Sequence, residues 1–376
     1  MLRIYETGDN HIGKKYDGHE RGGDFAEARI TALEKMVQKA NEEECELFAV
    51  TGDLFENRSV ASGTVSRVAG ILGGFSGTVL VLPGNHDYYA PDSELWGSFR
   101  AAKSGNTVLL NEKRPYVHDC ADGFRAAIYP AACFSLHSEE GVNNLDAIRS
   151  CGFNDDAHYR IGMAHGAVEG ETIDSEGKYF LMTRRELKEM PMDLWLIGHT
   201  HVPFPKLIEK YEKTDETIFN AGTHVQTDVN CHTPGLGFLL ELAEDGTVRA
   251  KRMISGELSF VRKIVEVVPG ELEERVRTAL ADIPDRSFVD LIMKGTLLKE
   301  EYESRAERVG RYTARFLEYR LTDTDTVRRL TEEDIDAAYP ESSICSALLK
   351  ELLSEPVEAQ MVHELLNGLK GVRMER

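Results

Sequence analysis

The chain has 376 residues and a formal net charge of −20, with 41% hydrophobic and 29% charged residues. This composition is typical of a folded globular protein and excludes a largely disordered chain. The length exceeds what one hydrophobic core usually fills, so we expect one large domain and a smaller one. The acidic balance disfavours a broad basic surface for nucleic acid, although the field at one site can differ in sign from the whole.

Membrane and disulfide chemistry are both disfavoured by the sequence. No segment approaches the roughly 18 apolar residues of a membrane span, and the first residues lack a secretory leader, so we expect a cytoplasmic protein. The cysteines show no CxxC spacing and are expected to be reduced thiols. They are Cys45, Cys120, Cys133, Cys151, Cys231 and Cys345.

Short apolar strands recur over residues 1 to about 255, separated by helical or irregular segments. Each is bounded by Gly or Pro, or is rich in β-formers, which is typical of buried strands in an α/β core. The segments are Leu2–Ile4, Leu47–Val50, Thr78–Leu82, Ile161–Ala164 and Leu194–Ile197.

Two helices of this region carry start signals. The segment Asp24–Ala40 repeats apolar residues at near-helical spacing, and Asp24 with Glu27 resembles a capping box. A second helix is predicted to start at Thr183, with Glu186 three residues later, and to stop before Pro191.

A β-hairpin is predicted near the end of the large domain, from Leu236–Glu241 through Asp245-Gly246 to Val248–Met253. It would add antiparallel strands to a sandwich of sheets. We therefore place the first domain at residues 1–257.

The remaining chain predicts a small α+β domain, residues 258–325, followed by helices over 326–376. Its expected elements are strands at 260–267, 287–293 and 314–321 and helices at 270–281 and 298–309. The terminal helices are expected at 331–337, 342–353 and 356–369, with caps at Thr331 and Ser354.

Five polar motifs follow the predicted strands of the large domain. In open α/β sheets, ligands bind at the carboxyl ends of strands, so residues far apart in the chain can converge there. The motifs are Gly8-Asp9-Asn10-His11, Gly52-Asp53, Gly84-Asn85-His86-Asp87, His165-Gly166 and Gly198-His199-Thr200-His201.

The spacing within these motifs suits a pair of metal ions. Side chains two apart on an extended segment point the same way, so Asp9 and His11 can bind one ion, while His199 and His201 can each approach one member of a pair. Glycine beside each ligand lets the backbone turn and lets a substrate phosphate approach. The carboxylate, imidazole and amide ligands favour manganese, iron or zinc.

The same residues suggest a division of chemical roles. Asp53 can bridge two ions roughly 3.5–4 Å apart, the spacing that clamps the attacking and leaving oxygens at phosphorus. His86 is not needed as a ligand and can protonate the leaving oxygen. Either Glu56 or Asp87 is expected to orient its imidazole.

A single buried histidine is more often a core residue than a ligand, and a single Gly-Asp is usually a turn. Five such motifs, each after an apolar strand, favour the metal site instead. His224 stays open, and the other histidines are interpreted as ordinary residues: His19, His118, His137, His158, His232 and His363.

Over about residues 1–225 these motifs resemble the calcineurin-like metallophosphoesterase superfamily, whose pattern is D-x-H, G-D, G-N-H-D or G-N-H-E, H and G-H-x-H. The resemblance implies a four-layer α/β/β/α sandwich, with His86 as the general acid. It implies one metal at Asp9, His11, Asp53 and His201, and another at Asp53, Asn85, His165 and His199.

Within that superfamily, Gly52-Asp53-Leu54-Phe55-Glu56 and the trailing α+β domain resemble the nuclease subunit of bacterial SbcCD and its archaeal and eukaryotic counterparts. The resemblance implies a manganese-dependent DNA nuclease of double-strand-break repair. It also implies that the α+β domain caps the active site and contacts DNA, and that the terminal helices bind the coiled coil of an ABC-type ATPase. Gly8, Glu56 and Thr223 depart from the usual residues, which puts the orientation of His86 and the substrate in question but removes no ligand.

Other functions remain open from the sequence. A small or cyclic-nucleotide phosphodiester fits the same chemistry, whereas Asn57-Arg58-Ser59 lacks the Asp-Arg-Gly run typical of phosphoprotein phosphatases. A non-catalytic scaffold, exonuclease against endonuclease action, and a homodimer are further open alternatives. The few basic residues near the predicted site loops are Lys14, Lys15, Arg21, Arg184 and Arg185.

Overall fold

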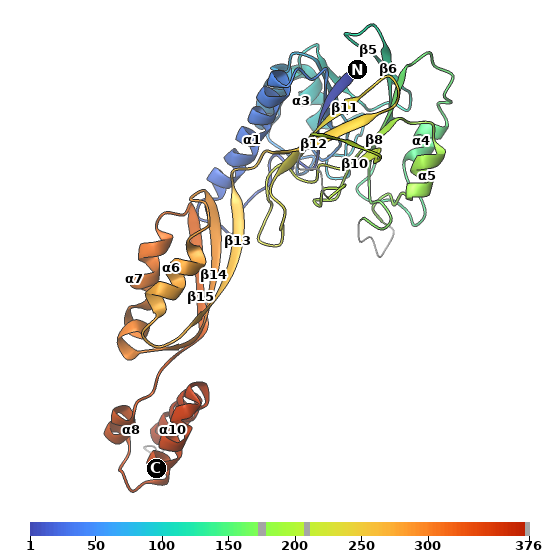
Figure 1. Ribbon diagram of the computed structural model, residues 1–376. Helices are drawn as coiled ribbons and strands as arrows, with labels where there is room; N and C mark the ends of the chain where they lie inside the picture. The colour runs from blue at the N-terminus through green and yellow to red at the C-terminus, as the bar shows by residue number, and fades with distance from the viewer. Residues whose placement is uncertain (172–177, 207–210, 373–376) are drawn as a thin grey trace. The chain divides into compact units, whose positions relative to one another are not determined.

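The computed structural model describes residues 1–171, 178–206 and 211–372, and the chain divides into two compact units, Met1–Leu258 and Ser259–Arg376 (Figure 1). The division falls one residue after the first domain expected from the sequence. Within the described ranges, no helix is long and apolar enough to cross a membrane.

The first unit contains a seven-stranded sheet in the order β4-β3-β2-β1-β11-β12-β9. Strands β1 to β4 are parallel, and β11 and β12 form the predicted antiparallel hairpin. Gly246 turns that hairpin at a φ of +77°. The strands are β1 Leu2–Thr7, β2 Leu47–Val50, β3 Thr78–Val81, β4 Thr107–Leu109, β9 Glu212–Thr214, β11 Leu236–Leu242 and β12 Val248–Ile254.

A five-stranded sheet in the order β10-β8-β7-β6-β5 faces the first sheet. Apart from the antiparallel edge strand β5, its strands are parallel. They are β5 Tyr116–Asp119, β6 Arg125–Ala131, β7 Tyr159–His165, β8 Leu194–Gly198 and β10 Ile218–Phe219. One apolar core joins Ile4, Ala49 and Leu80 of the first sheet to Ile128, Ile161 and Leu196 of the second.

Helices cover the outer face of each sheet and complete the four layers (Figure 1). On the first sheet lie α1 Gly22–Glu42, α2 Ser62–Gly73 and α3 Glu94–Ala102. On the second lie α4 Leu145–Arg149 and α5 Arg184–Glu189. The α/β/β/α sandwich expected from the sequence is confirmed.

Of the two predicted helix starts, one is confirmed and one is wrong. Glu186 N donates to Thr183 Oγ1 at 3.0 Å and Thr183 N donates to the Glu186 carboxylate at 2.9 Å, so α5 has its capping box. Helix α1 instead begins at Gly22, after Arg21, with no side-chain cap. Asp24 is therefore already inside the first turn, and Glu27 pairs with Arg67 of α2.

The second unit contains a parallel sheet, β13-β14-β15, with helices α6 and α7 packed on one face. The third strand starts at Glu318, later than the 314–321 predicted, because α7 continues to Thr313 and β15 pairs along β14 as far as Arg328. The elements are β13 Ser259–Val267, α6 Leu272–Leu280, β14 Ser287–Leu297, α7 Lys299–Thr313 and β15 Glu318–Arg328.

The chain then forms helices with a small core of their own. These are α8 Glu332–Ala338, α9 Ile344–Glu351, a 3-10 turn Leu352–Ser354 and α10 Pro356–Val372. Thr331 caps α8 as predicted, in a capping box with Asp334. The predicted cap at Ser354 is wrong, because Ser354 ends the 3-10 turn and Glu355 is the residue before α10.

Candidate metal centre

Seven side chains from the predicted motifs meet where parallel strands of the two sheets end. The loops after β1, β2 and β3 meet the carboxyl ends of β7 and β8, since the two sheets face each other. The residues brought together are Asp9, His11, Asp53, Asn85, His165, His199 and His201.

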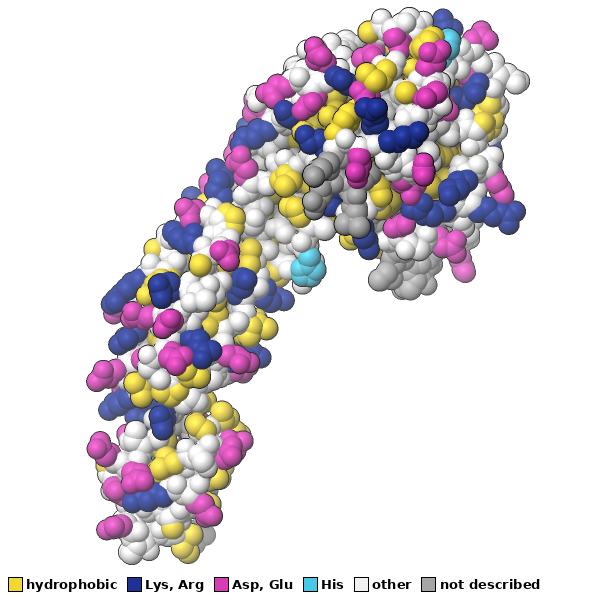
Figure 2. All heavy atoms as spheres, viewed as in Figure 1, with side chains coloured by type: hydrophobic (Ala, Val, Ile, Leu, Met, Phe, Trp, Pro, Cys, Tyr) yellow, Lys and Arg dark blue, Asp and Glu magenta, His cyan; other side chains and the backbone are white. Residues whose placement is uncertain are grey.

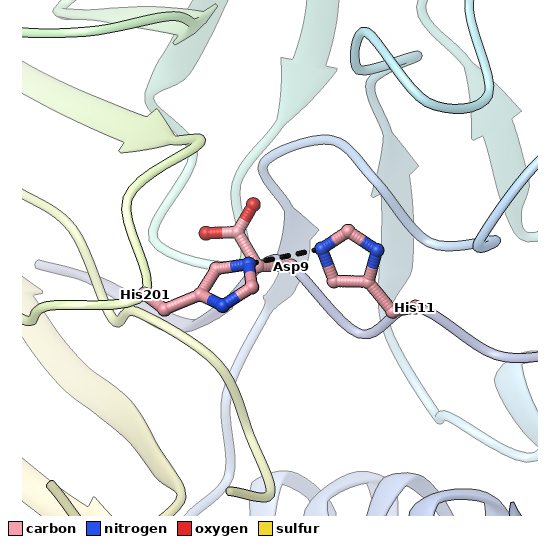
Figure 3. A group of neighbouring side chains, drawn as sticks. All are labelled: Asp9, His11 and His201. Carbon is pink, nitrogen blue, oxygen red and sulfur yellow. Dashed lines mark hydrogen bonds between the residues drawn. The ribbon is translucent and has the colours of Figure 1, made fainter. Parts of the chain in front are cut away.

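One group consists of Asp9, His11 and His201, whose candidate ligand atoms all lie within 4.8 Å of one another. Figure 3 shows the two imidazoles facing each other beside the Asp9 carboxylate, with His11 Nε2 3.0 Å from His201 Nε2. Two nitrogens bound to one tetrahedral ion at about 2.0–2.1 Å would lie about 3.3 Å apart. This group can therefore hold one metal ion after a small adjustment.

A second group consists of Asp53, His165 and His199, again within 4.8 Å of one another. The Asn85 amide oxygen lies 3.0 Å from both His165 Nε2 and His199 Nδ1. His165 is fixed by its other ring nitrogen, which donates to Thr51 O at 2.9 Å. These four residues can supply the oxygen and nitrogen ligands of a second ion.

Asp53 lies between the two groups. Its Oδ2 is 3.9 Å from His11 Nε2 and 3.3 Å from His165 Nε2. Its Oδ1 accepts a hydrogen bond from His86 N at 2.8 Å, which fixes the carboxylate. This position suits a carboxylate that bridges two ions.

The buried carboxylates of the site favour the binding of positive charge. Asp9, Asp53 and Asp87 are all at most 1% exposed. Burial raises the pKa of Asp9 well above its usual range, and burial together with Asp53 raises the pKa of Asp87 to about 7. Burying several carboxylates together costs several kcal/mol per ion unless counter-charges are present. Two divalent cations would supply them.

The pKa values of two histidines in the site are shifted in opposite directions. Burial lowers the pKa of His165, but Asp53 outweighs it and raises the value to about 9. Burial would also raise the pKa of Asp53, yet His165 and His11 hold it well below its usual range. Burial and the neighbouring His11 lower the pKa of His201 to about 3, which keeps that ring in the neutral form that binds metal.

Backbone strain is concentrated at the same residues. Among the non-glycine residues described, six have positive φ, and four of these are Asp9, His11, Asp53 and His199, at +47°, +44°, +50° and +108°. Such conformations cost about 1–3 kcal/mol each and persist where the surrounding structure enforces them, often at functional sites. These strained backbone conformations orient the four side chains toward the site and do not stabilise the fold.

Glycines of the motifs make room for the neighbouring ligands. A Cβ on Gly52, whose φ is +104°, would lie 2.1 Å from His165 Nδ1. A Cβ on Gly84 would lie 2.2 Å from Asp53 Oδ1. These contacts explain the two glycines by the packing of neighbouring side chains, and the positive φ of Gly52 agrees with the turn expected from the sequence.

His86 is partly exposed beside the site, and neither carboxylate expected to orient its ring accepts its hydrogen bond. His86 Nδ1 lies 3.1 Å from the backbone oxygen of Glu56, which can only accept, so Nδ1 is the donor. The Glu56 carboxylate lies 2.9 Å from His11 Nδ1. Asp87 accepts from the backbone amides of Phe55 and Gly84 at 3.0 and 2.7 Å. At Nδ1 of His86 the hydrogen-bond acceptor is therefore the backbone oxygen of Glu56, and not the carboxylate of Glu56 or Asp87 that the sequence suggested.

Arg29 is a positioning residue that the sequence reading missed. It is 1% exposed, and it donates to Asn10 O at 2.9 Å, Val225 O at 3.0 Å and Thr223 Oγ1 at 3.0 Å. It therefore ties the Asp9–His11 loop to the chain after β10. An arginine on the apolar face of α1, four residues after Phe25, was the signal that could have found it.

His224, left open by the sequence, lies near this network and not among the ligands. It is fully buried and its Nε2 donates to Arg29 O at 2.8 Å. Burial lowers its pKa well below the usual range, so the ring is neutral. Its role is to hold the helix that carries Arg29.

The fold and the paired ligand groups define a two-metal hydrolase centre. A family model described as calcineurin-like phosphoesterase matches residues 2–203, more than half of the chain. The chain belongs to the calcineurin-like phosphoesterase family, whose fold binds two divalent metals.

Solved structures with partial similarity come from several organisms. An archaeal phosphodiesterase is 12% identical, with a TM-score of 0.32, and the match covers 67% of this chain and 100% of that one. The purple acid phosphatase PPD1 from yellow lupin (Lupinus luteus) seeds is 17% identical, with a TM-score of 0.41 and coverages of 68% and 51%. A dimetal phosphatase from Danio rerio is 12% identical, with a TM-score of 0.36 and coverages of 68% and 98%. At these TM-scores the matches do not bear on the substrate.

Proposed function

We propose that this phosphoesterase is a manganese-dependent DNA nuclease that hydrolyses phosphodiesters at a two-metal centre. The observation that carries the phosphodiesterase chemistry is Asp53, whose one carboxylate oxygen faces His11 of one ligand group and His165 of the other. When bound, a metal pair activates water near neutral pH and neutralises charge on the phosphoryl oxygens. The mixed oxygen and nitrogen ligands, with no thiolate, are compatible with manganese, iron or zinc, and the resemblance to the SbcCD nuclease subunit favours manganese among them.

His86 is proposed to protonate the leaving oxygen. Its Nδ1–H donates to Glu56 O whether the ring is neutral or protonated, so proton exchange is confined to Nε2. The ring is partly exposed and lies 4.9 Å, centroid to centroid, from that of His11. An imidazole beside the site, where a substrate can reach it, has the position that general acid catalysis requires.

DNA as substrate is supported mainly by the trailing α+β unit and by the Gly52–Glu56 motif. Charge pairing supports a second candidate, a small or cyclic-nucleotide phosphodiester. Arg184 pairs with Glu171 and Glu216, and Lys14 pairs with Glu56. On the face drawn in Figure 2, Lys and Arg side chains are interspersed with Asp and Glu. Such pairing leaves less free positive charge for a phosphate backbone.

A partner that supplies DNA affinity would reconcile the acidic chain with a DNA substrate. Helix α10 exposes Val357, Met361 and Leu365 at intervals of four residues, which places them on one face. Their side chains are 44%, 65% and 65% exposed. This apolar face supports binding of a helical partner, which we propose is the coiled coil of an ABC-type ATPase.

A substrate panel tests the nuclease proposal. The full chain with manganese should digest linear duplex DNA, and an aryl phosphodiester should be hydrolysed at the same centre. Asn85→Ala and His201→Ala should abolish both activities while retaining the fold by circular dichroism. Turnover of aryl or cyclic-nucleotide diesters without DNA digestion, even with the ATPase present, would establish the second candidate instead. Failure on every phosphodiester would overturn the proposal as a whole.

A further inference from the structure

A second group of metal-binding side chain types lies at the amino end of β2, opposite the end that carries Asp53. Glu46 directly precedes β2, His118 lies in β5, and Cys120 follows β5. One candidate ligand atom from each lies within 4.8 Å of the others. The four residues of β2 span roughly 13 Å, so this group is separate from the two-metal centre.

The group joins the two sheets of the first unit. Strand β2 belongs to the seven-stranded sheet, whereas β5 is the edge strand of the five-stranded sheet. Cys120 is 6% exposed and packs in the core between the sheets. Glu46 and His118 are partly exposed, so an ion could enter from solvent and keep water as a further ligand.

His118 has the hydrogen bonding of a metal ligand. Its Nδ1 lies 3.3 Å from Thr78 Oγ1, which fixes the ring through the nitrogen away from the group. Its Nε2 is buried and has no hydrogen-bond partner. Nε2 lies 3.8 Å from Glu46 Oε2, too long for a hydrogen bond. Two ligands of one tetrahedral ion lie about 3.3–3.8 Å apart, so the gap fits a shared ion.

The surroundings favour a cation. Glu46 is held in place because its Oε2 accepts a hydrogen bond from Ala121 N at 2.7 Å. Burial raises the pKa of the Cys120 thiol to about 12, and the carboxylates of Glu46 and Asp122 add to the rise. The same negative field attracts a divalent ion, which displaces the thiol proton when it binds.

We propose that Glu46, His118 and Cys120 bind one zinc ion that clamps the two sheets together. A mixed thiolate, imidazole and carboxylate set suits zinc, whereas the two-metal centre has no thiolate. The inference does not depend on the proposed nuclease activity. It also changes the sequence-based interpretation of His118 as an ordinary residue.

Cobalt(II) distinguishes this site from the two-metal centre by spectroscopy. Only a thiolate ligand gives a sulfur-to-cobalt charge-transfer band in the near ultraviolet, whereas both sites give visible bands. Titration of the reduced, metal-free full chain should produce a charge-transfer band whose intensity at saturating cobalt corresponds to one thiolate-bound ion per chain, and zinc should displace it. Absence of the band from the wild-type chain at saturating cobalt would overturn the proposal.

Variants assign the ligands. Cys120→Ser should abolish the band, and His118→Gln should weaken cobalt binding at least about tenfold, since even outer-sphere changes cost about 10–100-fold. Cys133→Ser is the matched control, because that thiol lies 3.5 Å from His165 O at the two-metal centre and should leave the band unchanged. If Cys120→Ser does not fold, His118→Gln decides the question. Unchanged cobalt affinity in His118→Gln would refute the site. Loss of the charge-transfer band in Cys133→Ser would refute it as well.

Discussion

Asp9, His11 and Asp53 hold backbone angles that L-residues rarely adopt, and their neighbours keep them there. Arg29 binds backbone oxygens around Asp9, and the Asp53 carboxylate is fixed by His86 N. The motifs predicted which side chains would lie together, because their residue types and their places after the strands can be read from the sequence. The positioning groups were not predictable, because a long-range hydrogen bond such as that from Arg29 to Val225 O leaves no local pattern.

His86 can be tested through its leaving group. His86→Gln should lower kcat for a diester with a poor alkoxide leaving group by about 10²–10⁴-fold, the usual range for general acid catalysis. A nitrophenolate leaves without a proton, so its release should fall much less. Steady-state kinetics with both substrates measures the difference.

The exposed residue His232 provides the control, since His232→Gln should change neither rate. Metal content must be measured in parallel, because His86 also lies within reach of a group formed with His11 and Asp53. Equal losses on both substrates, accompanied by loss of metal, would make His86 a ligand and not an acid.

At the scale of elements, the sequence predicted the buried strands best and the irregular ends least. Strands such as Leu47–Val50 are continuous apolar runs with both faces buried, so composition alone marks them. The start of β15 was misplaced because its position depends on pairing with β14, and the α1 cap was misplaced because the helix starts two residues before Asp24. The first error concerns a contact with a residue distant in the sequence, and the second concerns the exact residue at which a helix begins.

A charged row across the three strands of the second unit should make its stability depend on pH. Asp290 of β14 is 2% exposed and accepts from Arg262 of β13 at 2.7 Å and Arg320 of β15 at 3.0 Å. Burial would raise the pKa of Asp290, but these two arginines outweigh it and lower the value. A lowered folded-state pKa means stability that is present above the unfolded value of about 3.9 and is lost as pH falls through the folded value.

Asp290→Asn should therefore reduce the free energy of unfolding of the second unit by about 1–3 kcal/mol at pH 7 and flatten its loss of stability in acid. Hydrogen exchange of the β13–β15 amides reports this unit alone. Asp325→Asn is the matched control, because Asp325 is 61% exposed beside Lys294 and its pair should contribute little. Equal effects of the two variants at pH 7 would contradict the argument.

For the whole molecule, a net charge of −20 weakens binding to the DNA backbone, so the proposed ATPase partner would add affinity for DNA to a chain that carries the hydrolytic centre. The exposed α10 face offers a testable place for that help. Leu365→Glu should abolish binding to the coiled-coil segment of an ABC-type ATPase from the same genome, because it places a charge in an apolar contact. Size-exclusion chromatography of the mixture measures the complex.

The same variant should leave aryl phosphodiester turnover unchanged, and stability within about 0.5 kcal/mol, since Leu365 is 65% exposed. Ile264→Glu, at another exposed apolar residue of the second unit, should bind the coiled coil as the wild type does. If Leu365→Glu still binds the coiled coil, the contact does not lie on α10. If the wild-type chain does not bind it, the proposed ATPase partner is ruled out. Coiled-coil binding and phosphodiester turnover therefore test the partner and the hydrolysis separately, because we expect hydrolysis at the Asp53 centre not to require α10.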